Sequence, residues 1–194
     1  MDPFGGKATF MAMQNYEAIN AEHGVYSVLG LMTVSLPRQH RWFVADYDNE
    51  NAKGAIFRAF EAEDEDAPEV ASILIADATN DPTEPDVSTL AQDDISSIDD
   101  FLRGDALTQL AADGRAMVEW GSSDLVQSEI SKALYTYFVV WDHGIERQNI
   151  VVRVKVKDRK MVAVGQYDTA KKEALALAIY EVMNNLSVFA PKVH

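Results

Sequence analysis

The sequence predicts an α+β protein, in which an antiparallel sheet of about six to seven strands is flanked by two main helices as an α/β/α sandwich. Two observations lead to this fold class. Three strand patterns in a row, at 133–141, 148–156 and 161–167, run directly into a long amphipathic helical pattern. A second helical pattern follows a short apolar run at 70–76. Helices that alternate with groups of strands in this way bury their apolar faces on a sheet.

In the first half of the chain, residues 25–36 alternate loosely and end at Pro37, and residues 41–47 are rich in aromatic and β-branched types. We expect these two strands to form a hairpin-like pair. Polar residues at 46–51 then predict a turn before a third strand at 55–60. The apolar run at 70–76 has the length of a central strand that is covered on both faces.

The first helix is expected to begin at Asp86 or Ser88, either of which can cap it, and to end at Gly104. Residues 107–112 add a turn or two, 115–120 resume as a strand, and the polar residues 121–131 predict a loop. The apolar positions of this helix are Val87, Leu90, Ala91, Ile95, Ile98 and Leu102, and its other face carries Asp93, Asp94, Asp99 and Asp100.

In the last third, turns at 142–144 and 157–160 join the three strand patterns as tight hairpins. Asp168 or Thr169 caps the last helix. Its apolar stripe has helical spacing and is expected to pack on the sheet; it consists of Leu175, Ala178, Ile179, Val182 and Leu186. Three tryptophans lie on predicted strands beside apolar neighbours, which predicts core positions for Trp42, Trp120 and Trp141.

The length of 194 residues fits one domain, which we place at 15–194 after a leader, or a segment added for expression, at 1–14. The absence of cysteine excludes disulfides, thiolate nucleophiles and cysteine-ligated zinc. No apolar run reaches the ~18 residues of a membrane span. We expect a cytoplasmic protein, or a periplasmic one if the first residues replace a signal peptide.

The net charge of −14 is concentrated in one segment. Residues 61–105 contain fifteen Asp or Glu and one basic residue, Arg103, whereas the rest of the chain is close to neutral. Such an acidic lobe disfavours nucleic-acid phosphates and attracts a basic partner.

The order of elements is similar to that of the PsbP-like, DcrB-like α/β/α sandwich family over about residues 27–189. The similarity rests on the stretch Val34-Ser35-Leu36-Pro37 before a strand with Trp42, a helix after the fourth strand, hairpins containing Arg147 and Arg153, a lysine-rich turn and a terminal helix. This resemblance implies a binding protein, because family members are photosystem extrinsic subunits, a Ran-binding nuclear-transport factor, periplasmic lipoproteins and chaperones of type VI secretion effectors. The acidic insertion at 61–66 and the predicted loop at 121–131 depart from the pattern, so no member's contact residues are transferred.

Two charged surfaces are the candidate partner-binding sites. Arg153, Lys155 and Lys157 alternate with valines, which places the three cations on one sheet face. This strip is either a solvated face that protects a strand from aggregation, or a surface that recognises an acidic partner or the chain's own acidic lobe. The acidic helix face with Asp93, Asp94, Asp99 and Asp100 is either solvated or binds a basic protein. The run 63–66 lacks the alternating acidic spacing of a calcium loop.

No catalytic constellation is recognisable. The four histidines, His23, His40, His143 and His194, show no metal-binding spacing, and the chain lacks a Gly-x-Ser-x-Gly elbow and a phosphate-binding glycine loop. We therefore expect no enzyme activity, no catalytic residue, no cofactor and no metal.

The function that these observations favour is a non-enzymatic protein-binding module, namely an adaptor, chaperone or accessory subunit, with a link to bacterial secretion as one form of it. The alternative is an acidic inhibitor or immunity protein that neutralises a basic toxin or a nucleic-acid-binding enzyme; a small hydrolase is the third class. The expected partner is another protein that is basic or presents an exposed hydrophobic segment, with a homodimer as a further option. Neither a nucleic-acid partner nor a membrane span is expected.

Overall fold

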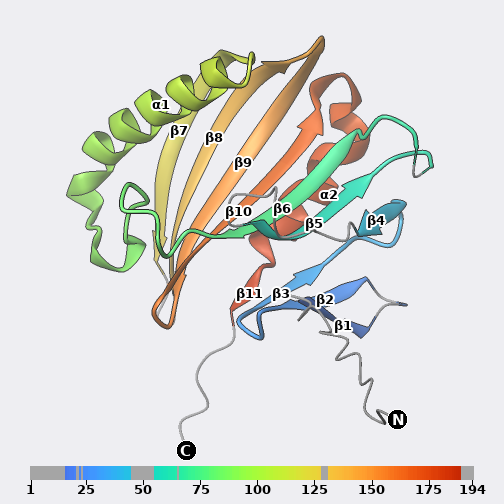
Figure 1. Ribbon diagram of the computed structural model, residues 1–194, viewed down its shortest axis with the longest axis horizontal. Coiled ribbons are helices and arrows are strands. Elements are labelled where there is room, and N and C mark those ends of the chain that lie inside the picture. The colour runs from blue at the N-terminus through green and yellow to red at the C-terminus, as the bar shows by residue number, and fades with distance from the viewer. Residues whose placement is uncertain are drawn as a thin grey trace, which may run out of the picture.

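A seven-stranded antiparallel sheet forms the centre of the molecule (Figure 1), which confirms the predicted fold class. The computed structural model describes residues 16–20, 22, 24–44, 55–64, 66–127 and 131–188, so the leader proposed at 1–14 and the turn at 46–51 lie outside the described residues. The strands of this main sheet lie in the order β4 (Trp42–Val44), β5 (Ala55–Glu61), β6 (Ala71–Asp77), β10 (Arg159–Asp168), β9 (Ile145–Val156), β8 (Lys132–Asp142) and β7 (Ala116–Gln127).

A second, smaller sheet has the order β1 (Tyr16–Asn20), β2 (Val25–Val28), β3 (Met32–Ser35) and β11 (Ser187–Val188). The single strand predicted at 25–36 is therefore wrong, as is its pairing with 41–47. Leu29 and Gly30 both adopt left-handed φ angles, 53° and 64°, and turn the chain back so that β2 and β3 form their own hairpin. Strand β4 pairs with β5 instead.

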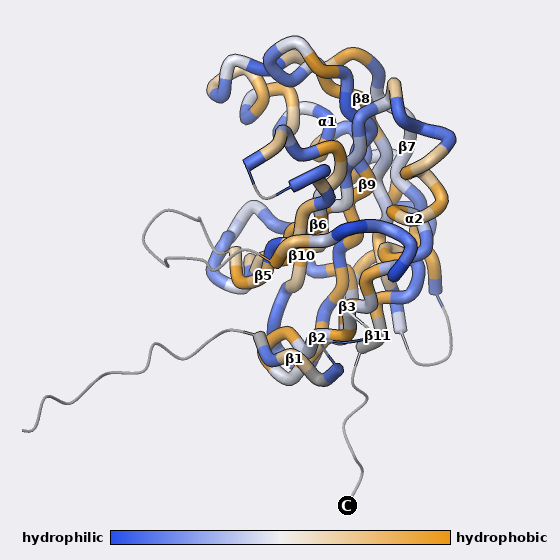
Figure 2. The backbone as a smooth tube through the Cα atoms, turned by 90° about the vertical axis from the view of Figure 1, so that its right-hand side faces the viewer, coloured by the Kyte–Doolittle hydropathy of each residue, from blue (hydrophilic) through white to orange (hydrophobic). Residues whose placement is uncertain are grey.

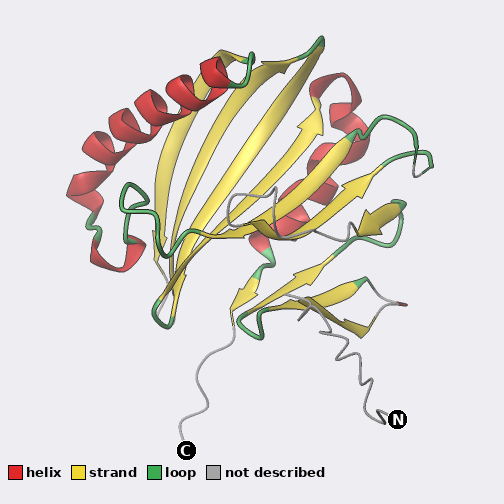
Figure 3. Cartoon of the chain, viewed as in Figure 1, coloured by secondary structure: helices red, strands yellow, loops and turns green. Residues whose placement is uncertain are grey.

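The two helices, α1 (Ile95–Ala112) and α2 (Lys172–Asn184), pack on opposite faces of the main sheet (Figure 3). Helix α2 and strands β2 and β3 cover one face and enclose the main core, in which Ile179 and Val182 of the predicted stripe are buried. Leu102 of α1 packs with Leu134 on the other face. Both helices are amphipathic, and hydrophobic stretches alternate with hydrophilic ones along the chain (Figure 2).

Helix α1 begins later and ends later than the sequence predicts. Asp86 accepts a hydrogen bond from the backbone of Ser88, but it caps only the 3₁₀ helix η2 (Val87–Thr89). A second 3₁₀ helix, η3 (Gln92–Asp94), precedes α1. Gly104 does not end α1, because it lies on the exposed side, where a helix tolerates glycine at a cost of ~1 kcal/mol. The chain turns at Gly114 instead, with a φ of 71°.

Strand β7 occupies most of the region predicted as a loop at 121–131, and residues 128–130 lie outside the described residues. Two features form the strand despite its polar composition. Gly121 lies so close to β8 that an added Cβ would be 2.8 Å from the carbonyl oxygen of Tyr137. The Ser123 and Thr136 hydroxyl oxygens lie 3.2 Å apart in a buried hydrogen bond between the two strands. Polar residues are expected here because β7 is an edge strand.

The tryptophans occupy three different environments. Trp120 stacks on Phe138 with ring centroids 5.4 Å apart, and Trp42 packs against the main core. Trp141 is 49% exposed, so its predicted core position is wrong. Helix α2 packs mainly on β10, and its Tyr180 reaches Tyr137 of β8, with ring centroids 6.5 Å apart.

Candidate functional site

The predicted basic strip of β9 faces the acidic segment that links β6 to α1. Arg153 Nε lies 2.7 Å from Glu84 Oε1, and both side chains are only 14% exposed. Lys155 Nζ lies 2.5 Å from Asp86 Oδ2. Lys157, expected on the same strand face, lies instead in the β9–β10 turn, with a φ of 56°. Two cations of the strip are thus paired with the chain's own acidic lobe, one of the pairings that the sequence left open.

Three further cations hold the same segment. Lys160 Nζ donates to the carbonyl oxygens of Asp81 at 2.6 Å and of Glu84 at 2.7 Å, and Lys132 Nζ donates to the carbonyl of Leu90 at 2.8 Å. Arg159 forms an ion pair with Asp77. Together these side chains form what we call the cation row: Lys132, Arg153, Lys155, Arg159 and Lys160. The row fastens residues 77–90, the segment that leads into α1.

The two central carboxylates of this arrangement differ in their electrostatics. Hydrogen bonds from Lys155, and next from Ser88, lower the pKa of Asp86 to about 2. Burial raises the pKa of Glu84, although the nearby Arg153 acts in the opposite direction. Asp86 is therefore firmly ionised at neutral pH, whereas the charge of Glu84 depends on its arginine partner.

The four acidic side chains predicted on one helix face do not act alike. Asp93 and Asp94 lie in η3 and are exposed, and Asp94 Oδ2 accepts a hydrogen bond from the Ala91 amide at 2.7 Å. Asp100 is exposed on α1. Asp99 instead turns toward the sheet, where its Oδ2 accepts a hydrogen bond of 3.0 Å from Trp120 Nε1. Three of the four are thus available to a partner, and Asp99 anchors α1 to β7.

Most of the large exposed apolar side chains belong to the same helix and to strands β7 and β8. Six large apolar side chains are exposed in the described part of the chain, and five of them are between 45% and 53% exposed and belong to α1, β7 and β8. These five, which we call the apolar edge group, are Phe101, Leu107, Val118, Val126 and Trp141. The sixth is Leu177 on α2. Single exposed apolar residues are ordinary, whereas several on adjoining elements are a candidate interaction surface. The group is spread out, because Trp141 lies opposite Ala116 at one end of the β7–β8 pair and Val126 lies opposite Ala133 toward the other end.

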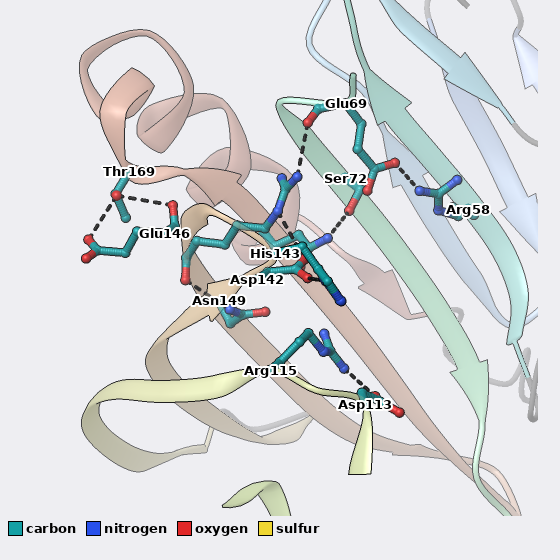
Figure 4. Close-up of polar contacts among 12 residues, drawn as sticks. Arg58, Glu69, Ser72, Asp113, Arg115, Asp142, His143, Glu146, Asn149 and Thr169 are labelled. Atoms are coloured by element: carbon teal, nitrogen blue, oxygen red, sulfur yellow. Dashed lines mark hydrogen bonds and ion pairs between the residues drawn. The ribbon is translucent and has the colours of Figure 1, made fainter. Parts of the chain in front are cut away.

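A polar cluster lies near the β8–β9 turn (Figure 4). The side chain of Arg147 is only 7% exposed; its Nε lies 3.3 Å from Asp142 Oδ2, and its Nη2 donates to the Glu69 carbonyl at 3.3 Å. Glu69 in turn pairs with Arg58. Within the described part of the chain, Arg147 Nε and Nη1 have no hydrogen-bond partner. Asp142 balances the charge of Arg147, and the contacts of Arg147 connect the β8–β9 turn to the residues between β5 and β6.

An open pocket of about 320 Å³ lies beside the small sheet. Its lining mixes both charges with aromatic rings and consists of Glu22, Gly24, Tyr26, Leu36, Pro37, Arg38, His40 and Trp42. This mixture selects no single class of ligand.

The histidines are dispersed. His40 Nδ1 lies 3.6 Å from Glu61 Oε1, and His143 Nδ1 lies 2.8 Å from Asp142 Oδ1, whereas His23 is outside the described residues. Among the residues that the structure describes, no three His, Cys, Asp or Glu side chains are grouped as metal ligands. Over the same residues, no helix has the length and apolar character needed to cross a membrane.

Sequence reasoning missed the β7 edge and its apolar group, because Gly121, Ser122, Ser123 and Asp124 are typical loop residues. One signal was present. Ser123 and Leu125 alternate with Ser122 and Asp124, as expected for a strand with one covered and one open face.

The fold is similar to that of a known protein, cyanobacterial PsbP (CyanoP) from Synechocystis. The two share a TM-score of 0.59 at 11% sequence identity, over 95% of this chain and 98% of that one. The chain therefore has the PsbP-like fold that its sequence predicts.

Two other solved structures are less similar. One is a protein from Bacteroides thetaiotaomicron, with a TM-score of 0.45 at 11% identity over 84% of this chain and 47% of that one. The other is a protein of unknown function from Pseudomonas aeruginosa, with a TM-score of 0.39 at 10% identity over 88% of this chain and 97% of that one. No family model and no curated protein matches the sequence.

Proposed function

We propose that the chain is a non-enzymatic protein-binding module, of the adaptor, chaperone or accessory-subunit kind, whose partner docks on the corner formed by α1 and β7. The observation that carries this proposal is the apolar edge group. An edge strand with exposed apolar side chains risks aggregation unless another protein covers it. Phe101 and Leu107 of α1 and Val118 and Val126 of β7 are such side chains on these two elements, and a partner that buried any of them would gain roughly 25 cal/mol for each Å² of apolar surface removed from water.

The charge of the same corner indicates the kind of partner. Residues 93–127 contain eight acidic side chains, at positions 93, 94, 99, 100, 105, 113, 119 and 124, and two basic ones, Arg103 and Arg115. Like charges on a partner would be repelled, so the partner is expected to be basic as well as partly apolar. The cation row supports this use of α1, because it fixes the segment before the helix and so lowers the entropic cost of binding.

The alternative, an acidic inhibitor or immunity protein, would use the same surface. The excess of carboxylates on α1 favours it, since a basic toxin or a nucleic-acid-binding enzyme presents the complementary charge. The two functions differ in their effect on the activity of the bound partner. An inhibitor abolishes the activity of its partner when the complex forms, whereas a chaperone or accessory subunit preserves it.

Two matched double variants test the proposal. The variant Asp100→Asn with Phe101→Ser alters α1, and Glu181→Gln with Leu177→Ser makes the same kinds of change on exposed positions of α2. Each protein is immobilised and a lysate of the source organism is passed over it. The protein captured by the unaltered chain is then purified, and its affinity for each variant is measured by calorimetry.

We expect the α1 variant to weaken binding at least about tenfold and the α2 variant to stay within about threefold. Binding should also weaken as salt is raised. Equal affinities for the two variants, with both proteins folded by circular dichroism, would refute the docking site on α1 and β7.

A further inference from the structure

Strand β7 consists of an irregular half and a regular half. Its pairing with β8 shifts register between Met117 and Glu119 and again between Trp120 and Ser122. From Ser122 to Gln127 the register is unbroken, opposite residues 137 to 132. Bulges discourage an edge from pairing further, so the regular half is the part of β7 that can accept another strand.

The regular half has an open backbone edge. In the described part of the chain β7 pairs with β8 and with no other strand. Alternate residues of an antiparallel strand direct their N–H and C=O groups away from the neighbour. Roughly three of the six residues at 122–127 therefore present unpaired donors and acceptors, enough to hold a short extended segment.

The side chains of this half distinguish its two faces. Ser123 is buried and Leu125 is partly buried against the cluster under α1. Ser122, Asp124 and Val126 lie on the other face and are exposed. A strand added at the edge would place its own side chains beside these three, so that positions two apart face Asp124 and Val126.

The geometry points to strand addition: the β7 edge at 122–127 accepts an extended segment of a basic partner, with a lysine or arginine beside Asp124 and an apolar residue two positions away beside Val126. This inference rests on the proposed function and specifies how the partner binds. A second copy of the chain fits less well, because it would bring the eight acidic residues of its own 93–127 segment against the same charges.

The probe is a capped synthetic peptide, Thr-Val-Thr-Lys-Thr-Val-Thr-Lys, which presents Val and Lys alternately on one face. We expect saturable binding with a Kd below about 1 mM, measured by nuclear magnetic resonance, with amide shifts centred on 122–127. The same peptide with Glu in place of Lys should bind at least about tenfold more weakly. The variant Asp124→Lys should reverse this preference, whereas Glu181→Lys on α2 should keep it.

Two further peptides separate strand addition from simple charge attraction. They carry N-methyl groups on the odd or on the even residues, which removes the N–H donors of one strand edge at a time. One of them should lose at least about tenfold in affinity. Equal binding of both, or no binding of the unmodified peptide at millimolar concentration, overturns the inference.

Binding of the natural partner separates a failure of this inference from a failure of the proposed function. If Asp100→Asn with Phe101→Ser loses that partner while Asp124→Lys and Val126→Glu retain it, docking on α1 stands and strand addition is refuted. Analytical ultracentrifugation tests the remaining possibility, a homodimer that forms through β7. A dimer that becomes a monomer in the Val126→Glu variant would place a second copy on β7 and refute the basic partner.

Discussion

Helix α2 approaches β10 so closely that the sheet carries a glycine at the contact. A Cβ added at Gly165 would lie 2.8 Å from Met183 Cγ and 2.9 Å from Ile179 Cγ2, distances that real Cβ atoms essentially never show. The substitution Gly165→Ala must therefore move the helix or displace both side chains. We expect a net loss of ~1–3 kcal/mol, although the less flexible unfolded chain returns ~0.4–1 kcal/mol of that cost.

The opposite perturbation removes the helix side of the contact. Ile179 is fully buried, so Ile179→Ala leaves a cavity and should cost about 2–4 kcal/mol, or roughly 6–12 °C in Tm at ~3 kcal/mol. In the double variant the new methyl group at position 165 occupies space that Ile179 Cγ2 vacates. The combined loss should then be smaller than the sum of the single losses by about 1 kcal/mol.

Urea unfolding followed by tryptophan fluorescence and circular dichroism measures all four proteins. Coincident transitions by the two probes would justify a two-state analysis. Single losses below ~1 kcal/mol, or a double variant that is additive within ~0.3 kcal/mol, would show that α2 does not pack at Gly165 as described.

Four other substitutions give distinct outcomes. Arg153→Leu leaves the buried Glu84 without its partner, so we expect a loss of ~2–4 kcal/mol in unfolding free energy at neutral pH. Because burial raises the pKa of Glu84, this carboxyl takes up a proton as the pH falls and the loss becomes smaller. Urea titrations at two pH values measure the change. Because the folded pKa of Asp86 is lowered from 3.8 to about 2, its contribution is present above about pH 4 and lost as the pH falls toward 2, so Asp86→Asn should flatten the pH dependence of unfolding in that window. A Cβ added by Gly104→Ala meets no atom within 4 Å, so this substitution should stabilise α1 by ~0.5–1 kcal/mol. Gly121→Ala should instead destabilise β7, because the Tyr137 carbonyl oxygen of β8 leaves no room for a Cβ. Thermal melts in which both substitutions shift Tm in the same direction would contradict this contrast.

The C-terminal half of the fold could be predicted because its signals are local. Two-residue turns such as His143-Gly144 set the register of neighbouring strands, and Val152, Val154 and Val156 of β9 alternate with charged residues. The predictions that fail concern elements whose conformation depends on distant neighbours. Leu29 turns left-handed within an apolar run, and Gly121 belongs to a strand only because Tyr137 lies beside it.

The candidate site was predictable in its composition but not in its contacts. Alternation places Arg153 and Lys155 on one face of β9, as the structure shows, yet Glu84 and Asp86 reach them from far earlier in the chain. No local pattern encodes such a pairing. Likewise, the exposure of Phe101 depends on how α1 lies across β7, which the spacing of apolar residues alone does not determine.

The main sheet contains one pairing between strands that lie far apart in the sequence, which we call the seam. Strands β6 and β10 are hydrogen-bonded neighbours, although α1, β7, β8 and β9 all lie between them in the sequence. Strands β7, β8, β9 and β10 are consecutive in the sequence and can pair early. Strand β6 can pair with β10 only after the chain has closed a loop from residue 77 to residue 159. We therefore expect the seam to form last and to set the folding rate. The cation row then stabilises this junction, because its ion pairs and hydrogen bonds hold residues 77–90 where the two halves of the chain meet.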